Sequence, residues 1–582
     1  MKALVPVLLT CLLCLTMHAQ PVSVTTDGLT LHADETALAA WQERHHPVLH
    51  GFPISEQLVL TSGVTAPLRF EKAERVVLVI DPGKTQARGT LICTRPDGTE
   101  LQRLQITRND RRLLLEVGTA DFNLHFQQSG KAEKLHLTRI YVVPPVSQNA
   151  MRDFGFNTSL DCEPNASCPD GAPWSDQVRA AVRIMMVLQE GVGWCSGTLM
   201  NNTAGDGRPF ILSAEHCLAE YTPMWDLWRF DFSYRSDACM TPGTEPVASS
   251  LTGCTLRAKQ RDTDFLLLEL NDPVPVFFNA YFSGWNRTPD YAPGKTVLIH
   301  HPSGDIAKMS TDFHQITLWE NSLIWNEGYT TPENTHYRSR FDLGTFEPGS
   351  SGGAIFDTSR HVIAQLHGGI GDCNANTAYS GRVSVSWEYG DDASGRLADW
   401  LDPLGTGQMI LDGSEHPDQG NVFHVTGVVR DPMGRPVRDV MVTLDGGVVL
   451  NVEADTNGVF AISELPRSSE ITFSARKNNN PKNGVSAADL FLIKKHLLGD
   501  APFTEPWQVL AADATGNATV SAGDILILQK LLLGLVAVLP TQDAWIFDPP
   551  SISVLEPADS EVQIEFTAIK VGDVNGTADP NQ

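Results

Sequence analysis

The sequence predicts a mainly β protein built from several domains. Its 582 residues exceed the usual size of one domain, and the 42% of apolar residues allows sizeable cores. Short apolar runs separated by glycine, proline, asparagine and aspartate recur along the chain, a pattern typical of many short strands. Seven cysteines cluster between Cys162 and Cys373, which indicates a disulfide framework around one domain.

The overall charge narrows the range of partners. The chain has 43 Lys and Arg against 69 Asp and Glu, a net charge of −26. A polyphosphate would be repelled and no local basic patch offsets this, so nucleic-acid binding is not expected. After the N-terminus no apolar run reaches 18 residues, so no membrane span is expected.

Residues 1–19 have the pattern of a secretory signal peptide. Lys2 supplies a positive charge, residues 4–15 form an apolar core, and Met17-His18-Ala19 precedes a cleavage site. The protein is therefore expected to be secreted. Export to an oxidising compartment agrees with disulfides rather than a zinc site, since no pair of CxxC knuckles occurs.

Residues 20–156 predict a β-rich region without a catalytic constellation. Apolar runs such as Arg75–Ile80 and Leu113–Val117 alternate with Asp-Gly and Pro-Gly turns. The stretch Val143–Val146 leads into a polar segment with the composition of a linker.

Two separate motifs in the cysteine-rich part predict nucleophilic catalysis. Glu347–Ala354 contains Gly-x-Ser-Gly-Gly, in which glycines let the backbone turn sharply and leave Ser351 exposed beside backbone N–H groups. An apolar run ends in Ser213–Cys217, which offers His216 as a base for that serine. Asp264 opens a strongly apolar stretch and is the favoured carboxylate, with Asp262 as its rival.

These motifs belong to a longer ordered set. It comprises Gly193–Thr198, Ser213–Cys217, Thr263–Phe265, Gly284-Trp285, His300–Pro302, Glu347–Gly352, Gln365–Gly369, Gly381–Val383 and Asp399–Pro403. Through this set, residues 157–413 resemble the bacterial lysyl endopeptidases, which are trypsin-like serine proteases.

The resemblance implies a two-barrel, chymotrypsin-like protease domain over 157–415. Its triad would be His216, Asp264 and Ser351, with the N–H groups of Gly349 and Ser351 as the oxyanion hole. The chain would hydrolyse proteins or peptides and need no cofactor for catalysis. It would be made as a zymogen whose pro-region, 20–156, is cut off near Asn157.

The resemblance also implies three disulfides, Cys162–Cys373, Cys168–Cys239 and Cys195–Cys217. Cys93 and Cys254 are left as free thiols or as a pair across the pro-region boundary. A local Cys239–Cys254 bridge is the alternative to the second pairing.

Substrate preference does not follow from the resemblance. Lysine-specific relatives place an aspartate shortly before the Gly-Arg-Val segment, but 373–381 contains no carboxylate and Asp372 lies before Cys373. A buried substrate ammonium without a counter-charge is unfavourable. Thr345 and His367 resemble the pocket of glutamyl endopeptidases, and small or apolar side chains are equally open.

The C-terminal part predicts two binding modules. Residues 421–475 alternate in period two and resemble carboxypeptidase-regulatory β-sandwiches, and residues 478–537 contain a duplicated loop and helix that resembles dockerin type I repeats. The tail, 538–582, is β-like. The second loop offers Ca²⁺ the side chains of Asp513, Thr515, Asn517, Ser521 and Asp524. A metal-free helical hairpin is the alternative.

These modules leave a second functional hypothesis. The protease-like domain would be an inactive scaffold, and the dockerin-like module would bind a cohesin-like or cell-surface partner. The intact triad positions and oxyanion glycines favour the enzyme.

Overall fold

A computed structural model of the chain contains mainly β-structure in two compact units. Unit 1 comprises residues 1–204, 208–272 and 283–413, and unit 2 comprises 205–207, 273–282 and 414–582. The predicted signal peptide, 1–19, lies outside the described residues. The structure describes residues 22–32, 34–44, 49–84, 87–106, 111–128, 134–144, 155–218, 221–326, 328–445, 449–467, 470–536, 538–539 and 542–582.

The N-terminal part of unit 1 is β-rich, as its alternating runs predict. Its strands occupy a five-stranded sheet, β2-β5-β10-β7-β8, and one end of a larger sheet. The elements are β1 (Val22–Ser23), β2 (Leu29–His32), α1 (Glu35–Arg44), β3 (Leu49–Ile54), β4 (Leu58–Thr61), β5 (Thr65–Glu71), β6 (Arg75–Asp81), β7 (Gly89–Thr94), β8 (Glu100–Ile106), β9 (Leu113–Val117), β10 (Asp121–Gln128) and β11 (Lys134–Val143).

The larger sheet continues without a break into the first part of the protease-like region. Strand β3 pairs with β13, where Gly51 lies opposite Val192. Arg229 joins this contact, since its guanidinium lies 3.0 Å from Glu116 in β9. The elements of this part are α2 (Ser175–Ala180), β12 (Ala181–Val187), β13 (Val192–Met200), β14 (Phe210–Ala214), β15 (Arg229–Phe232), β16 (Ser249–Thr252), β17 (Cys254–Gln260) and β18 (Phe265–Leu270).

The rest of unit 1 forms a nine-stranded sheet of order β21-β20-β26-β27-β28-β25-β22, with β19 and β29 at its side, and a separate hairpin. The elements are β19 (Trp285–Asn286), β20 (Thr296–His300), β21 (Lys308–Asp312), β22 (Thr317–Trp319), β23 (Leu323–Ile324), β24 (Thr330–Thr331), β25 (His336–Ser339), β26 (Ala354–Phe356), β27 (Val362–Ile370), β28 (Thr377–Arg382), α3 (Val383–Ser386), α4 (Ala398–Leu401) and β29 (Ile410–Leu411).

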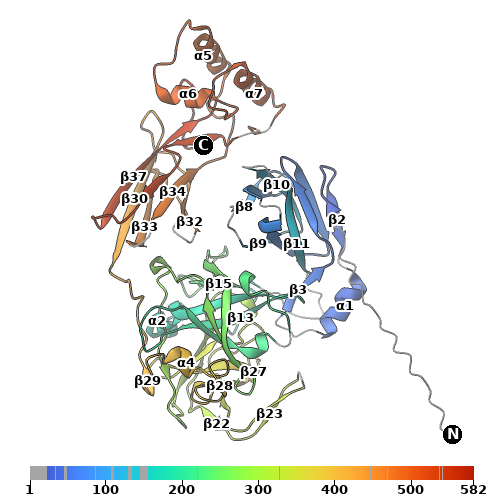
Figure 1. Ribbon diagram of the computed structural model, residues 1–582, viewed down its shortest axis with the longest axis vertical. Helices are drawn as coiled ribbons and strands as arrows, with labels where there is room; N and C mark the ends of the chain where they lie inside the picture. The colour runs from blue at the N-terminus through green and yellow to red at the C-terminus, as the bar shows by residue number, and fades with distance from the viewer. Residues whose placement is uncertain are drawn as a thin grey trace, which may run out of the picture. The chain divides into compact units, whose positions relative to one another are not determined.

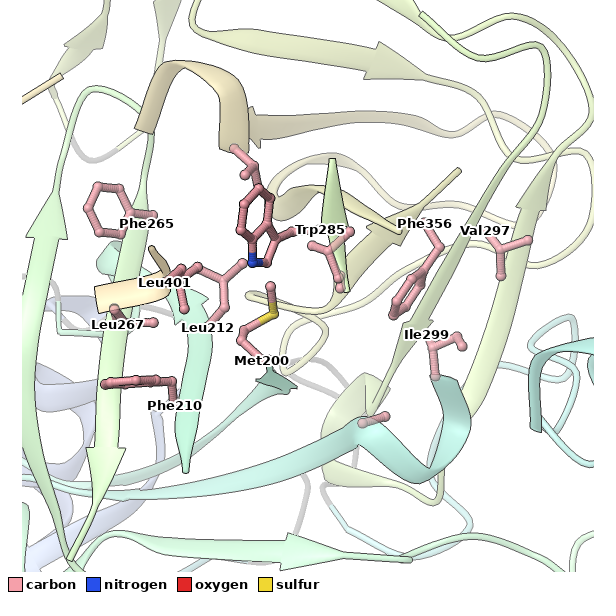
Figure 2. Close-up of a cluster of buried hydrophobic side chains, with 14 of the residues drawn as sticks. Met200, Phe210, Leu212, Phe265, Leu267, Trp285, Val297, Ile299, Phe356 and Leu401 are labelled. Carbon is pink, nitrogen blue, oxygen red and sulfur yellow. The ribbon is translucent and has the colours of Figure 1, made fainter. Parts of the chain in front are cut away.

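One apolar core joins the two sheets of the protease-like region. Met200 and Phe210 come from the first sheet, and Trp285 and Phe356 come from the second; all four are wholly buried. Figure 2 shows these side chains converging, with Leu401 of α4 beside them. Truncating a buried tryptophan such as Trp285 to alanine costs about 3–5 kcal/mol of stability. This core therefore holds the two sheets of the protease-like region together.

Unit 2 is a β-sandwich that contains more of the chain than residues 421–475. Its sheets have the orders β33-β30-β37-β35 and β32-β31-β34-β36. Strand β37 runs parallel to β30 and lies between it and β35, so the predicted β-like tail belongs to the sandwich. The strands are β30 (Val422–Arg430), β31 (Met441–Asp445), β32 (Val449–Glu453), β33 (Val459–Pro466), β34 (Ile471–Arg476), β35 (Trp545–Asp548), β36 (Ile552–Val554) and β37 (Glu561–Lys570).

The duplicated segment forms helices between β34 and β35. They are α5 (Ala487–Leu498), α6 (Pro506–Ala512) and α7 (Ala522–Leu532), and Figure 1 shows them gathered beyond one end of the sandwich. The helices of the two repeats, α5 and α7, each begin with a capping box, formed by Ser486 with Asp489 and by Ser521 with Asp524. Among the residues just described for both units, no helix is long and apolar enough to cross a membrane.

Candidate active site

Three separate segments of unit 1 bring together a hydroxyl, an imidazole and a carboxylate. His216 Nε2 lies 2.7 Å from Ser351 Oγ, and His216 Nδ1 lies 2.9 Å from Asp264 Oδ2. The backbone N–H of His216 also donates to Asp264 Oδ1 at 2.8 Å. The chain therefore contains a continuous hydrogen-bonded relay from a serine to a buried carboxylate.

Strand register explains how the carboxylate meets the imidazole. Antiparallel β14 and β18 pair Ala214 with Phe265, so His216 just beyond the first strand faces Asp264 just before the second. Asp264 has a positive φ of 54°, which aspartate tolerates better than most residues. Asp262, its rival in the sequence, instead accepts a hydrogen bond from the Tyr389 hydroxyl at 2.9 Å.

The surroundings of Asp264 fix the orientation of the imidazole. The carboxylate is fully buried, and burial raises its pKa while the contacts from His216 lower it. A carboxylate only accepts hydrogen bonds, so Nδ1 of His216 must carry the proton that faces it. Nε2 is then the ring nitrogen that can accept the proton of Ser351.

The glycine-rich turn that carries Ser351 has an unusual backbone conformation and unpaired N–H groups. Gly349 has a φ of 97°, a conformation that favours glycine, and its carbonyl accepts a hydrogen bond from Ser196 Oγ. Within the described parts of the chain, the N–H groups of Gly349 and Ser351 have no hydrogen-bond partner. Two free donors next to a nucleophile can stabilise an oxyanion.

His367 lies against the relay instead of apart from it. Its ring stacks on His216 at 5.2 Å and on Trp325 at 3.5 Å between centroids. Its Nδ1 is 2.9 Å from His336 Nε2, and its Nε2 is 2.6 Å from the Tyr329 hydroxyl. Burial lowers the pKa of His336 to about 3, so that ring is neutral near pH 7.

The sequence did not indicate Trp325, Tyr329 or His336. They come from the β23–β25 region, which shares no motif with the catalytic segments, so only the fold brings them to His367. Thr345, the other predicted pocket residue, is fully buried and donates to the carbonyl of Asp372 at 3.3 Å.

The same relay has the residue types of a metal site. His216, Asp264 and His367 each place one potential ligand atom within 4.8 Å of the others. Hydrogen bonds join His216 to Asp264 and Ser351, while His367 stacks on His216 and its Nδ1 lies 3.6 Å from Asp264 Oδ2. These contacts account for the convergence of the three side chains.

The structure forms three disulfides, which join Cys162 to Cys373, Cys168 to Cys239 and Cys195 to Cys217. The last ties the His216 turn to β13. Cys93 and Cys254 are both buried free thiols. Burial raises the pKa of Cys93 to about 12 and raises that of Cys254 further, so both thiols stay protonated near neutral pH.

The predicted calcium residues form one compact loop in unit 2. Asp524 accepts hydrogen bonds from Thr515 and Ser521, and Asp513 accepts from the N–H groups of Asn517 and Ala518. The first repeat is completed differently. Asp573, near the C-terminus, accepts from the N–H groups of Thr577 and Ala578, while Asp489 accepts from the N–H of Val574.

Comparison with known proteins points to proteases. Residues 156–381 match the family described as lysyl endopeptidase, C-terminal domain. A lysyl endopeptidase of Pseudomonas aeruginosa is 28% identical over 236 residues, which are 38% of this chain and 48% of that protein. This chain therefore spans about half the length of that curated relative.

Solved structures give weaker likenesses. A protease of M. tuberculosis in its active form is 16% identical, covers 41% of this chain and 89% of its own, and has a TM-score of 0.26. An HtrA-type protease with a decapeptide is 12% identical, with coverage of 36% and 62% and a TM-score of 0.25.

Proposed function

We propose that this chain is a secreted serine endopeptidase. The observation that carries the proposal is the relay of Ser351, His216 and Asp264 beside the two free N–H groups. The match to a lysyl endopeptidase domain supports the same reaction class. The scaffold alternative has less support, because a binding protein has no need for this aligned buried relay.

The proposed reaction proceeds through an acyl-enzyme. Ser351 Oγ attacks the carbonyl carbon of the scissile bond as His216 Nε2 takes its proton. The N–H groups of Gly349 and Ser351 stabilise the negative oxygen that forms. His216 then protonates the leaving amine, and later removes a proton from the water that releases the acyl group. Asp264 holds the required tautomer throughout.

For the preferred substrate residue we propose an uncharged side chain, small or apolar. Lysine would need a carboxylate in the pocket. The nearby Asp372 is exposed, and its side chain accepts hydrogen bonds from the N–H groups of Asn374 and Ala375 in its own loop. Glutamate would need a free donor, but both ring nitrogens of His367 have partners. Thr345 adds no charge.

The N-terminal region, 20–156, is proposed to be the pro-region of a zymogen. It extends the sheet of the first barrel through β3, and ion pairs join Glu116 to Arg229 and Arg112 to Asp226. These contacts support a pro-region that folds and docks on the first barrel in one specific arrangement. An unstructured leader would not need a buried complementary surface.

For unit 2 we propose a binding role through the dockerin-like helices, with a cohesin-like or cell-surface partner. Ca²⁺ in the loop of Asp513, Thr515, Asn517, Ser521 and Asp524 is part of that proposal. Two carboxylates and three polar oxygens suit calcium chemically, although their oxygens also accept N–H bonds from the loop. Calcium titration followed by the unfolding temperature tests it, with Asp524→Asn as the variant that should abolish any increase.

The endopeptidase proposal is tested by digesting a denatured protein mixture with the processed protein and mapping cut sites by mass spectrometry. Cuts after small or apolar residues, absent with Ser351→Ala, would support both the reaction and the preference. Cuts after lysine or glutamate would support the reaction and overturn the preference. Silence from a verified processed protein would favour the scaffold.

A further inference from the structure

A second set of carboxylate, imidazole and hydroxyl groups ends at Ser350, the residue before the proposed nucleophile. Oγ of Ser350 lies 2.8 Å from Nδ1 of His300. Nε2 of the same ring lies 3.3 Å from Oε2 of Glu163. All three residues are buried, and the side chains of Glu163 and His300 are wholly so. We call this set the supporting relay, since its groups follow the same order as those of the catalytic relay.

Hydrogen bonds around His300 fix which ring nitrogen carries its proton. The hydroxyl of Ser310 donates to the carbonyl of Thr345 at 2.6 Å, so its oxygen can only accept where it lies 3.4 Å from His300 Nε2. Nε2 therefore carries the proton, which faces Glu163 and Ser310. In the neutral ring Nδ1 is then the acceptor, and the hydroxyl of Ser350 is the donor beside it.

The carboxylate of Glu163 depends on His300 for its burial. Among the residues that the structure describes, neither carboxylate oxygen of Glu163 has a polar partner apart from this approach of His300. A buried carboxylate is costly unless an opposite charge or a donor faces it. The neighbouring Cys162 is held by its disulfide to Cys373, which keeps the carboxylate in this position. Glu163 therefore orients His300 as the catalytic carboxylate orients the catalytic imidazole.

Ser350 connects the supporting relay to the proposed oxyanion hole through the backbone. Its Oγ accepts the N–H of Glu347 at 3.0 Å, and its carbonyl accepts the N–H of Gly353 at 2.9 Å. The packing is tight, since a Cβ on Gly353 would lie 2.9 Å from Cβ of His300. The carbonyl of Ser350 belongs to the same planar peptide group as the N–H of Ser351, so the position of Ser350 sets the direction of that N–H.

We propose that Glu163 and His300 are positioning residues that hold Ser350, and through it the N–H of Ser351, in the arrangement that stabilises the oxyanion. The inference rests on the proposed endopeptidase function and adds residues that never touch the substrate. The supporting relay is already formed in the full-length chain. Its loss should slow the chemical step and leave substrate binding largely unchanged, because the oxyanion forms only in the transition state.

Two single variants and their combination test the proposal on the processed protein. Glu163→Gln keeps the shape of the side chain but removes the charge that favours a proton on Nε2 of His300. Ser350→Ala removes the hydroxyl that His300 holds. Each variant should lower kcat for a peptide substrate by about 10- to 100-fold with little change in KM, as expected when one oxyanion donor is misplaced.

The double variant distinguishes a relay from two independent defects. If Glu163 acts through His300 on Ser350, the double variant should have the kcat of Ser350→Ala, because the hydroxyl is already gone. Losses that multiply would show that the two residues act independently and would overturn the proposal. An unchanged kcat in Ser350→Ala would overturn it as well, whether or not Glu163→Gln folds.

Asp357→Asn is the matched control, since Asp357 is a buried carboxylate of the same unit that lies 3.7 Å from Nδ1 of His361. Its kcat should stay near that of the wild type. An equal fall in kcat for this control would mean that the relay variants act through general destabilisation, and the proposal would fail. Ser351→Ala is measured alongside, so failure of the endopeptidase function itself is recognised by a wild-type protein that is no more active than this variant.

Discussion

The substitution Asp264→Asn tests whether the carboxylate orients His216, because it keeps the shape of the side chain and changes only its hydrogen bonding. The carboxylate accepts two bonds from His216, one from the backbone N–H at 2.8 Å and one from ring Nδ1 at 2.9 Å. An amide has one oxygen, so it can serve only one of these donors. If the amide oxygen of the variant keeps the hydrogen bond from the backbone N–H of His216, the amide NH₂ group faces ring Nδ1. Nδ1 must then accept a hydrogen bond, so the ring proton moves to Nε2.

That tautomer cannot take the proton of Ser351, so kcat should fall by about 10⁴, equivalent to about 5 kcal/mol in the barrier. The fall is measured by steady-state kinetics on the processed protein, with urea unfolding as a check on stability. Asp262→Asn is the matched control and should keep near wild-type kcat, since Asp262 contacts Tyr389. A large loss for Asp262→Asn with little loss for Asp264→Asn would refute the assignment.

Three further predictions concern other parts of the molecule. In Gly381→Ala, the new Cβ would lie 1.7 Å from the carbonyl oxygen of Thr263, so the segment bearing Asp264 must shift; kinetics should show a severe loss of activity, and a fully active variant would contradict the geometry. Glu116→Gln should lower the free energy of unfolding of the full chain by about 2 kcal/mol, because it weakens the pair with Arg229; an unchanged urea midpoint would contradict this. Burial lowers the pKa of Lys570 from 10.5 in the unfolded chain to about 7 in the folded protein. Between pH 7 and pH 10.5 the unfolded state therefore binds more protons than the folded state. The free energy of unfolding should rise with pH over this range, by up to about 1.4 kcal/mol per pH unit. Hydrogen exchange of β37 should show this rise and Lys570→Met should flatten it; an equal slope in both proteins would exclude Lys570 as its source.

Much of the candidate site could be predicted from residue types and local motifs. Ser351 lies in a glycine-flanked turn and His216 ends an apolar run, both of which are local patterns. The apolar stretch that follows Asp264 favours it over Asp262 in the sequence, and the register of β14 with β18 places Asp264 opposite His216. The disulfide pairs came from the resemblance, because spacing alone leaves several pairings open.

Long-range packing accounts for what the sequence could not predict. Trp325 and His336 stand in no catalytic motif, and only the fold brings their rings against His367. The sandwich in unit 2 could not be bounded either, since β37 pairs with β30 across the intervening helices. Period-two alternation identifies a strand but not its partner, so the β-like end of the chain was separated from the sheet it completes.

Treatment of the processed protein with a phosphonylating reagent for activated serines, with the adduct located by mass spectrometry, tests the catalytic role of Ser351 most directly. We predict one adduct per chain, on Ser351, which is lost in Ser351→Ala and in His216→Ala because the imidazole 2.7 Å away activates the hydroxyl. An adduct on Ser350, or labelling of Ser351 that persists in His216→Ala, would show that Ser351 is not the nucleophile activated by His216.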